Sequence, residues 1–117
     1  MELTSDVKTR VERSGEADVV YVEGEMCLPG AGHLQRVLAT TLEAGRRVVL
    51  DLAGATAIDL AGLQLLCSAH RTSRGGPRTF ELRAVPERLR NTACAAGFDA
   101  RTLVCPYRGD GACLWKD

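Results

Sequence analysis

The chain has 117 residues, a length typical of one domain whose core is large enough to fold without disulfides or a structural metal. Its hydrophobic content of 45% and charged content of 26% are ordinary for a globular protein and argue against disorder. The 15 Lys and Arg residues balance the 15 Asp and Glu residues, so the basic surplus typical of a nucleic-acid-binding protein is missing.

The sequence carries no signal for export or for membrane insertion. Its first 20 residues are charged where a signal peptide needs an apolar core. The longest apolar region, residues 48–69, is interrupted by two aspartates and two glycines and is therefore no transmembrane helix. The 5 cysteines cannot all pair within one chain, and without a secretory signal we expect them to be reduced. We expect a cytoplasmic protein.

The first half of the chain predicts two strands followed by a helix. Residues 7–12 alternate between apolar and polar, 14–16 form a turn, and 18–23 are rich in β-branched residues. Glycine and proline break the pattern in residues 24–32. From His33 the apolar residues recur at i, i+3, i+4 and i+8, which predicts a helix that ends near Gly45.

The second half predicts strands that alternate with helices. A largely apolar strand covers residues 47–52, and a loop leads to a helix over residues 59–71. A strand over 79–83 precedes a helix with Pro86 in its first turn. A short strand is expected at 102–104. Strands joined by single helices predict an α/β fold with a mixed four- to five-stranded sheet and helices packed on it.

The organisation of the chain predicts a single domain. We find no internal repeat and no linker, so residues 1–117 are assigned to one domain. Within it, residues 104–117 have no clear period and are expected to form an irregular C-terminal tail.

The junction that leads into the helix at residue 59 is the most informative part of the sequence. Asp59 can cap that helix by accepting from the backbone of Ala61 or Gly62, and this role alone explains an acid there. Leu60 is unusual at the tip of a turn: it either folds back into its own core or presents an apolar side chain to a partner. Gly62 removes bulk, so that another backbone could approach.

The run VVLDLAGATAIDLAGLQLL, residues 48–66, resembles the corresponding part of a STAS domain, the fold of bacterial anti-sigma factor antagonists and of sulfate transporter tails. The resemblance covers roughly residues 7–103. Its most specific part is strand, loop and Asp-x-x-Gly-Leu, here Asp59, Leu60, Ala61, Gly62 and Leu63. The resemblance implies a STAS-like fold and a protein without catalytic activity.

Two positions depart from the pattern of the antagonists. In that group a Ser or Thr follows the aspartate and is phosphorylated by the partner kinase, which is also the anti-sigma factor. Leu60 and Ala61 stand there in this chain, so no phosphorylation is expected at the family position. The nearest hydroxyl upstream of Asp59 is that of Thr56, three residues before it, which we assign to the loop and regard as a weak substitute for the missing phosphorylation site. Family members often show Gly-Glu-Leu-Asp before the first helix, whereas here Glu25 is followed by Met and Cys27.

Catalytic, cofactor and metal motifs are not found. The sequence has no Ser/His/Asp set with family-type spacing, no phosphate-binding loop and no dinucleotide signature. Cys105 and Cys113 are not spaced as a zinc half-site, and His33 and His70 lie on other elements. We therefore expect no enzyme, no cofactor and no metal site.

These observations favour a non-catalytic regulatory module that acts by protein–protein contact. Its predicted partner-binding residues are Asp59, Leu60, Ala61, Gly62 and Leu63, together with Glu25 and Cys27. The expected partner is an anti-sigma factor or histidine-kinase-like regulator, or another signalling protein, and a homodimer is left open. The alternative is an accessory STAS subunit of a lipid-transporting ABC system. A phosphate-handling enzyme would rest on fold analogy alone.

Overall fold

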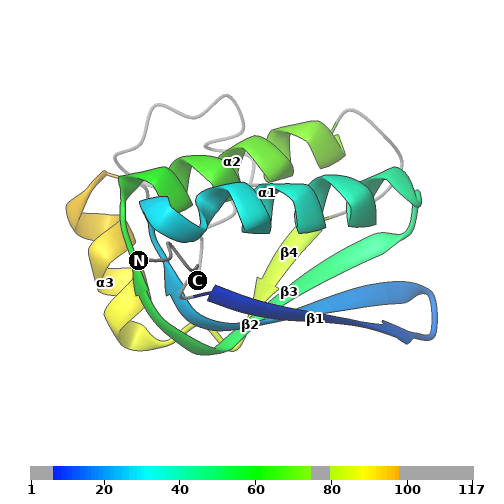
Figure 1. Cartoon of the computed structure of the whole chain (residues 1–117), viewed down its shortest axis with the longest axis horizontal. Helices are drawn as coiled ribbons and strands as arrows, with labels where there is room; N and C mark the ends of the chain where they lie inside the picture. The colour runs from blue at the N-terminus through cyan, green and yellow to red at the C-terminus, as the bar shows by residue number, and fades with distance from the viewer. Residues whose placement is uncertain (1–6, 75–79, 98–117) are drawn as a thin grey trace, which may run out of the picture.

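The computed structural model describes residues 7–74 and 80–97. These residues form a mixed sheet with helices α1 and α2 stacked side by side on one face (Figure 1). The elements in chain order are β1 (Val7–Ser14), β2 (Ala17–Met26), α1 (Leu28–Glu43), β3 (Arg47–Ile58), α2 (Leu60–Arg74), β4 (Phe80–Arg83) and α3 (Glu87–Ala95). The predicted α/β fold class is confirmed.

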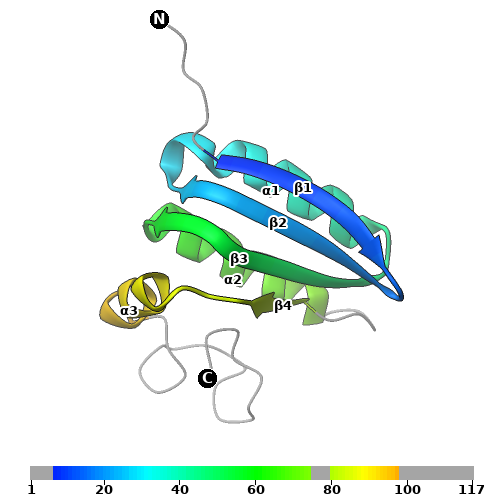
Figure 2. The same cartoon turned by 90° about the horizontal axis from the view of Figure 1, so that it is seen from below.

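The strand order in the sheet is β1-β2-β3-β4. β1 pairs antiparallel with β2, and β2, β3 and β4 pair parallel. The parallel connections run through α1 and α2, and both helices lie behind the same face of the sheet (Figure 2). α3 follows β4 and lies near the carboxyl end of β3, where Arg88 Nη1 donates to the carbonyl oxygen of Thr56 at 3.3 Å.

The hydrophobic core fills the space between the two helices and the sheet. Alternate strand residues face it because side chains point to opposite faces along a strand. The largest side chains with less than 2% exposure come from both layers and from α3: Met26, Leu34, Leu38, Leu50, Leu52, Leu63, Leu66, Leu89, Val20, Val22 and Val48. Each contributes about 1.5–3 kcal/mol by burial, so this layer stabilises the positions of both helices.

Helix α1 begins earlier than its apolar period predicts. It starts at Leu28 rather than His33, with a proline in the first turn, where its missing N–H is not needed. β2 likewise runs on to Met26, past Gly24, which adopts a positive φ of 97°. The predicted break at residues 24–32 is therefore wrong: glycine and proline there shape a strand end and a helix start.

β3 is also longer than predicted. It continues beyond Leu52 to Ile58, so Thr56 belongs to a strand and not to a loop. Most of the residues between are alanine or glycine, which have little strand propensity of their own, but pairing with β2 keeps them extended, as in Gly24 with Ala55 and Met26 with Ile58. The extension delivers the next residue, Asp59, to the edge where α1 begins.

Some expectations concern residues that the structure does not describe. The strand at 102–104 and the irregular tail at 104–117 lie outside the described residues. In the part that is described, no helix has the length and apolar character needed to cross a membrane.

Gly62 explains how closely α2 approaches the sheet. A Cβ atom there would lie 2.2 Å from the carbonyl oxygen of Met26 and 2.8 Å from Cγ1 of Ile58. The backbone that approaches Gly62 is thus the end of β2 in its own chain, not a partner. Any larger residue must push the first turn of α2 off the sheet.

We predict that Gly62→Ala destabilises the domain by about 1–3 kcal/mol because the added methyl group overlaps backbone atoms. Gly32→Ala, also within a helix, is the matched control: its Cβ would meet only Arg36 Nη1, at 3.7 Å, so helix propensity should stabilise the domain by about 0.5–1 kcal/mol. Urea unfolding measures both free energies. An equally stable Gly62→Ala variant would contradict the close packing.

Candidate partner-binding surface

Asp59 joins the starts of α1 and α2 to the end of the sheet. Its Oδ1 accepts from the backbone N–H of Gly62 at 3.0 Å, and its Oδ2 accepts from the backbone N–H of Leu28 at 2.9 Å. Its own N–H donates to the carbonyl oxygen of Met26 at 3.4 Å, and its carbonyl accepts from Leu63 at 2.9 Å. One residue therefore caps two helices that are far apart in sequence.

The two caps suit the charge of the group that provides them. The first backbone N–H groups of a helix have no intrahelical partner and carry partial positive charge, so a carboxylate stabilises them. The N-cap residue of α1, Cys27, makes no side-chain cap hydrogen bond, and Asp59 supplies that bond from 31 residues further along. The geometry matches the predicted capping of α2, whereas the second cap is long-range and was not foreseen.

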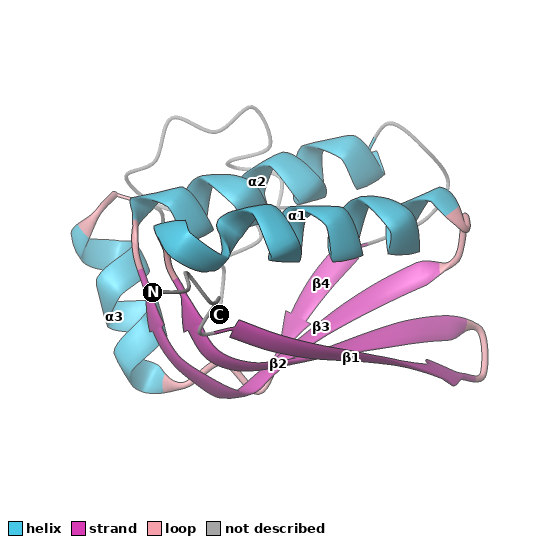
Figure 3. Cartoon of the chain, viewed as in Figure 1, coloured by secondary structure: helices cyan, strands magenta, loops and turns pink. Residues whose placement is uncertain are grey.

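Two leucines stand exposed at these helix starts. Leu60 opens α2 with 55% of its surface exposed, and Leu28 opens α1 with 69% exposed. Both helices begin at the same end of the molecule, beside the carboxyl ends of β2 and β3 (Figure 3). Among the described residues Val11 is the other exposed large apolar side chain. Leu60 therefore does not fold back into its own core.

The predicted site residues divide into exposed and buried groups. Ala61 and Cys27 are partly exposed and Glu25 is exposed, all near the same end of the sheet. Gly62 is buried and Leu63 is only 1% exposed, in the core. These two residues cannot contact a partner directly; they support the surface from below.

Leu28 was missed by the sequence analysis because it falls in the stretch that we assigned to irregular structure. A leucine directly before a proline is a signal that could have identified it, since proline favours the first turn of a helix. We define the helix-start surface as Leu28, Asp59, Leu60 and Ala61.

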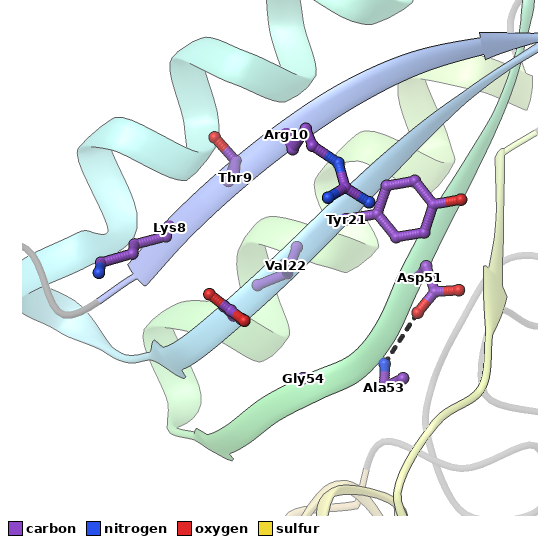
Figure 4. Close-up of a pocket in the computed structure, with 9 residues that line it drawn as sticks. Lys8, Thr9, Arg10, Tyr21, Val22, Asp51, Ala53 and Gly54 are labelled. Atoms are coloured by element: carbon purple, nitrogen blue, oxygen red, sulfur yellow. Dashed lines mark hydrogen bonds between the residues drawn. The ribbon is translucent and has the colours of Figure 1, made fainter.

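The opposite face of the sheet carries a polar hollow of about 450 Å³ (Figure 4). Within it Arg10 lies over the ring of Tyr21, 4.4 Å from its centroid. Asp51 Oδ1 accepts from the backbone N–H of Ala53 at 2.9 Å, the dashed line in Figure 4. Arg83 Nε donates to Asp51 Oδ2 at 2.9 Å. The bond to Asp51, and a weaker one to Tyr21, hold the pKa of Arg83 above its ordinary value.

This polar row follows the register of the sheet. Arg10 faces Tyr21, Tyr21 faces Asp51, and Asp51 faces Arg83 across the four strands. Because these side chains contact one another across neighbouring strands, the row that lines the hollow stabilises the sheet. In the described part of the chain, no three His, Cys, Asp or Glu residues are placed to hold a metal ion.

We predict that Asp59→Ala lowers the free energy of unfolding by about 2 kcal/mol, because it removes the cap of α2 and leaves the backbone N–H of Leu28 without its acceptor. Asp59→Asn keeps one acceptor oxygen, so its free energy of unfolding should lie between those of wild type and Asp59→Ala. Chemical denaturation followed by circular dichroism provides the measurement.

Glu87→Ala is the matched control for Asp59→Ala, because Glu87 is an acid in the first turn of α3. Its removal should cost only a few tenths of a kcal/mol through the helix dipole. Equal losses of unfolding free energy in the two variants would show that the double cap contributes no more to stability than an ordinary acid in the first turn of a helix.

Comparison with known proteins places this geometry in a family. The family model described as Mlab, STAS domain, matches residues 9–105. Among curated proteins no match is found.

Solved structures show the same fold. An anti-sigma factor antagonist from Mycobacterium paratuberculosis superposes with a TM-score of 0.71 at 23% identity, over 91% of this chain and 90% of that chain. Mglu is 29% identical with a TM-score of 0.60 over 68% of this chain, which spans only 20% of Mglu. The murine anion transporter Slc26a9 gives a TM-score of 0.63 at 18% identity, over 71% of this chain and 14% of the transporter.

The model match covers most of the sequence, and the Asp-x-x-Gly-Leu junction lies inside it, at the start of α2. The chain belongs to the STAS domain family.

Proposed function

We propose that this protein is a non-catalytic regulatory module that binds a partner protein through the helix-start surface. The observation that carries the proposal is the exposure of Leu60 and Leu28, 55% and 69%, at two helix starts that one carboxylate holds together. Exposed apolar groups that lie together on a protein surface often mark a site of protein–protein contact. Burial of each leucine by a partner would contribute about 1.5–3 kcal/mol.

The contact is constitutive in this proposal. Leu60 stands where the family resemblance implies a phosphorylated Ser or Thr, and it has no hydroxyl. A phosphate at a helix start would add nearly two negative charges beside Asp59 and change the docking surface. A leucine cannot be switched in this way, so the amount of partner or of this protein sets the occupancy.

Glu25 and Cys27 border the same surface. Glu25 is exposed near the end of β2, and Cys27 is partly exposed directly before α1. Ala61 is small and leaves the side chain of Leu60 accessible from the side of α2. An apolar centre with a polar rim is the usual anatomy of a protein–protein interface.

An anti-sigma factor or histidine-kinase-like regulator in the cytoplasm is the partner class that we propose first. The supporting observation is the fold shared with the Mycobacterium paratuberculosis anti-sigma factor antagonist along nearly the whole of both chains. Such a partner would present an apolar pocket that receives the two leucines.

A second candidate is an accessory STAS subunit of a lipid-transporting ABC system. The observation that favours it is that the surface has no hydroxyl at the family position. The murine anion transporter Slc26a9 shows only that the fold also occurs within a transporter. In that case the partner would be a transporter subunit, and the same two leucines would make a permanent contact.

We predict that Leu60→Asp combined with Leu28→Asp abolishes partner capture while the domain stays folded. An acid in the first turn of a helix is favourable, so these changes should not unfold α1 or α2. Affinity capture from the native cytosol with quantitative mass spectrometry measures the bound partner, and its identity separates a kinase-like regulator from a transporter ATPase. Recovery of the same partner at wild-type levels with the double variant would refute the site.

Ala39→Asp is the matched control for this experiment. Ala39 is an exposed small apolar residue within α1, away from the helix start, and its replacement adds one carboxylate where the double variant adds two. It should leave capture unchanged, and thermal unfolding should show that all three proteins are folded.

A further inference from the structure

β1 is an edge strand that lacks two of the features that usually prevent edge pairing, a bulge and a proline. It pairs with β2 in a continuous register from Val7 to Ser14, without a bulge and without proline. Among the described residues no strand lies on its other side, where β1 forms the border of the sheet (Figure 2). A regular edge of this length presents backbone donors and acceptors that another strand can pair with.

The side chains of β1 alternate between two environments. Thr9 faces the helix layer, where its Oγ1 lies 3.1 Å from Nε2 of His33. Val11 shares that face by the alternation of the strand, but it is 47% exposed. Arg10 and Glu12 lie on the opposite face, joined by a 3.0 Å ion pair in which both side chains are more than half exposed. The strand therefore carries one uncovered apolar residue between two opposite charges.

We propose that two copies of this chain pair antiparallel through β1, with the two-fold axis beside Val11. In this register Val11 faces Val11 of the second copy on the helix side. On the open side Arg10 faces Glu12 of the second copy, and Glu12 faces Arg10 of the second copy. Each favourable pair thus occurs twice, as an isologous interface requires. The two sheets would join into one, with the helices of both copies on the same face.

The charges of β1 select this register over its neighbours. Side chains alternate between the two faces of a strand, so a shift of one residue would place the helices of the two copies on opposite faces. The two β1 strands can therefore shift only in steps of two residues if the helices are to stay on the same face. A register centred on Arg10 would place Arg10 against its own copy, and one centred on Glu12 would place Glu12 against its own copy. Like charges directly opposite each other destabilise an antiparallel pair. Of these three registers, only the one centred on Val11 avoids both repulsions.

Arg10 is also positioned before the second copy arrives. Its guanidinium lies 4.4 Å from the centroid of the Tyr21 ring, which holds the side chain along the sheet surface. Less side-chain freedom is therefore lost when Arg10 exchanges its exposed partner within the chain for the equivalent carboxylate of the second copy.

Sedimentation equilibrium of the full chain, over a wide concentration range, tests the proposal. We expect a reversible dimer. Arg10→Glu should raise its dissociation constant about tenfold or more, because contacts between two carboxylates replace both attractive pairs. Glu12→Arg should do the same through contacts between two guanidinium groups. Mixing the two variants should restore dimers, since every cross-strand pair in a heterodimer is again of opposite charge.

Lys8→Glu is the matched control, with the same change of charge on the same face of β1. In the proposed register Lys8 lies opposite Ser14 of the second copy, so the dissociation constant should stay within about twofold of wild type. In the register centred on Arg10, Lys8 would lie opposite Glu12 and the variant would dissociate. Circular dichroism should show that each variant is folded.

Three results would overturn the proposal: a monomer at all concentrations, no recovery on mixing, or an equal effect of Lys8→Glu and Arg10→Glu. The inference is independent of the helix-start surface. The double variant at Leu28 and Leu60 should dimerise like wild type, so failure of one proposal is distinguishable from failure of the other.

Discussion

The carboxylate of Asp59 accepts hydrogen bonds from the backbone of Leu28 and of Gly62, and these two bonds set the relation between α1 and α2. Without a shared acceptor, each helix would need its own cap, and Cys27 makes no side-chain cap hydrogen bond for α1. The backbone N–H of Asp59 also bonds to Met26, so the same residue ties both helices to the end of β2. A negative charge suits this place because two positive helix ends converge on it.

The helix-start surface follows from this arrangement together with the packing beneath it. Gly62 lets α2 sit against the carbonyl of Met26, and Leu63 anchors the same turn in the core. With its inner side held so closely, the first turn of α2 directs Leu60 outward, next to the end of α1 that carries Leu28. An exposed apolar side chain, Leu60, therefore stands at the position where the family resemblance implies a phosphorylated hydroxyl.

The face of the sheet opposite α1 and α2 carries polar side chains instead of exposed leucines. There the polar row from Arg10 to Arg83 crosses all four strands, with Arg10 over the ring of Tyr21 and Arg83 bonded to Asp51. Its outermost member, Arg10, lies on the edge strand beside Val11, where the row ends and a second copy can continue it. The two proposed contacts, one to a partner and one to a second copy, therefore use different parts of the fold.

Local patterns in the sequence determined the fold class, most of the elements and the cap of α2, because strand alternation, helix periodicity and a cap three residues from its donor depend on neighbouring residues. Tertiary structure alone decided the start of α1 at Leu28, the extension of β3 to Ile58 and the exposure of Leu60. It also decided why residue 62 is glycine: the backbone that approaches it belongs to Met26 of the same chain, which is distant in sequence, and not to a partner. The start of α1 rests on the bond from Leu28 to Asp59, the extension of β3 on its pairing with β2, and the position of Gly62 on the end of β2. Such long-range contacts leave no periodic signal in the chain.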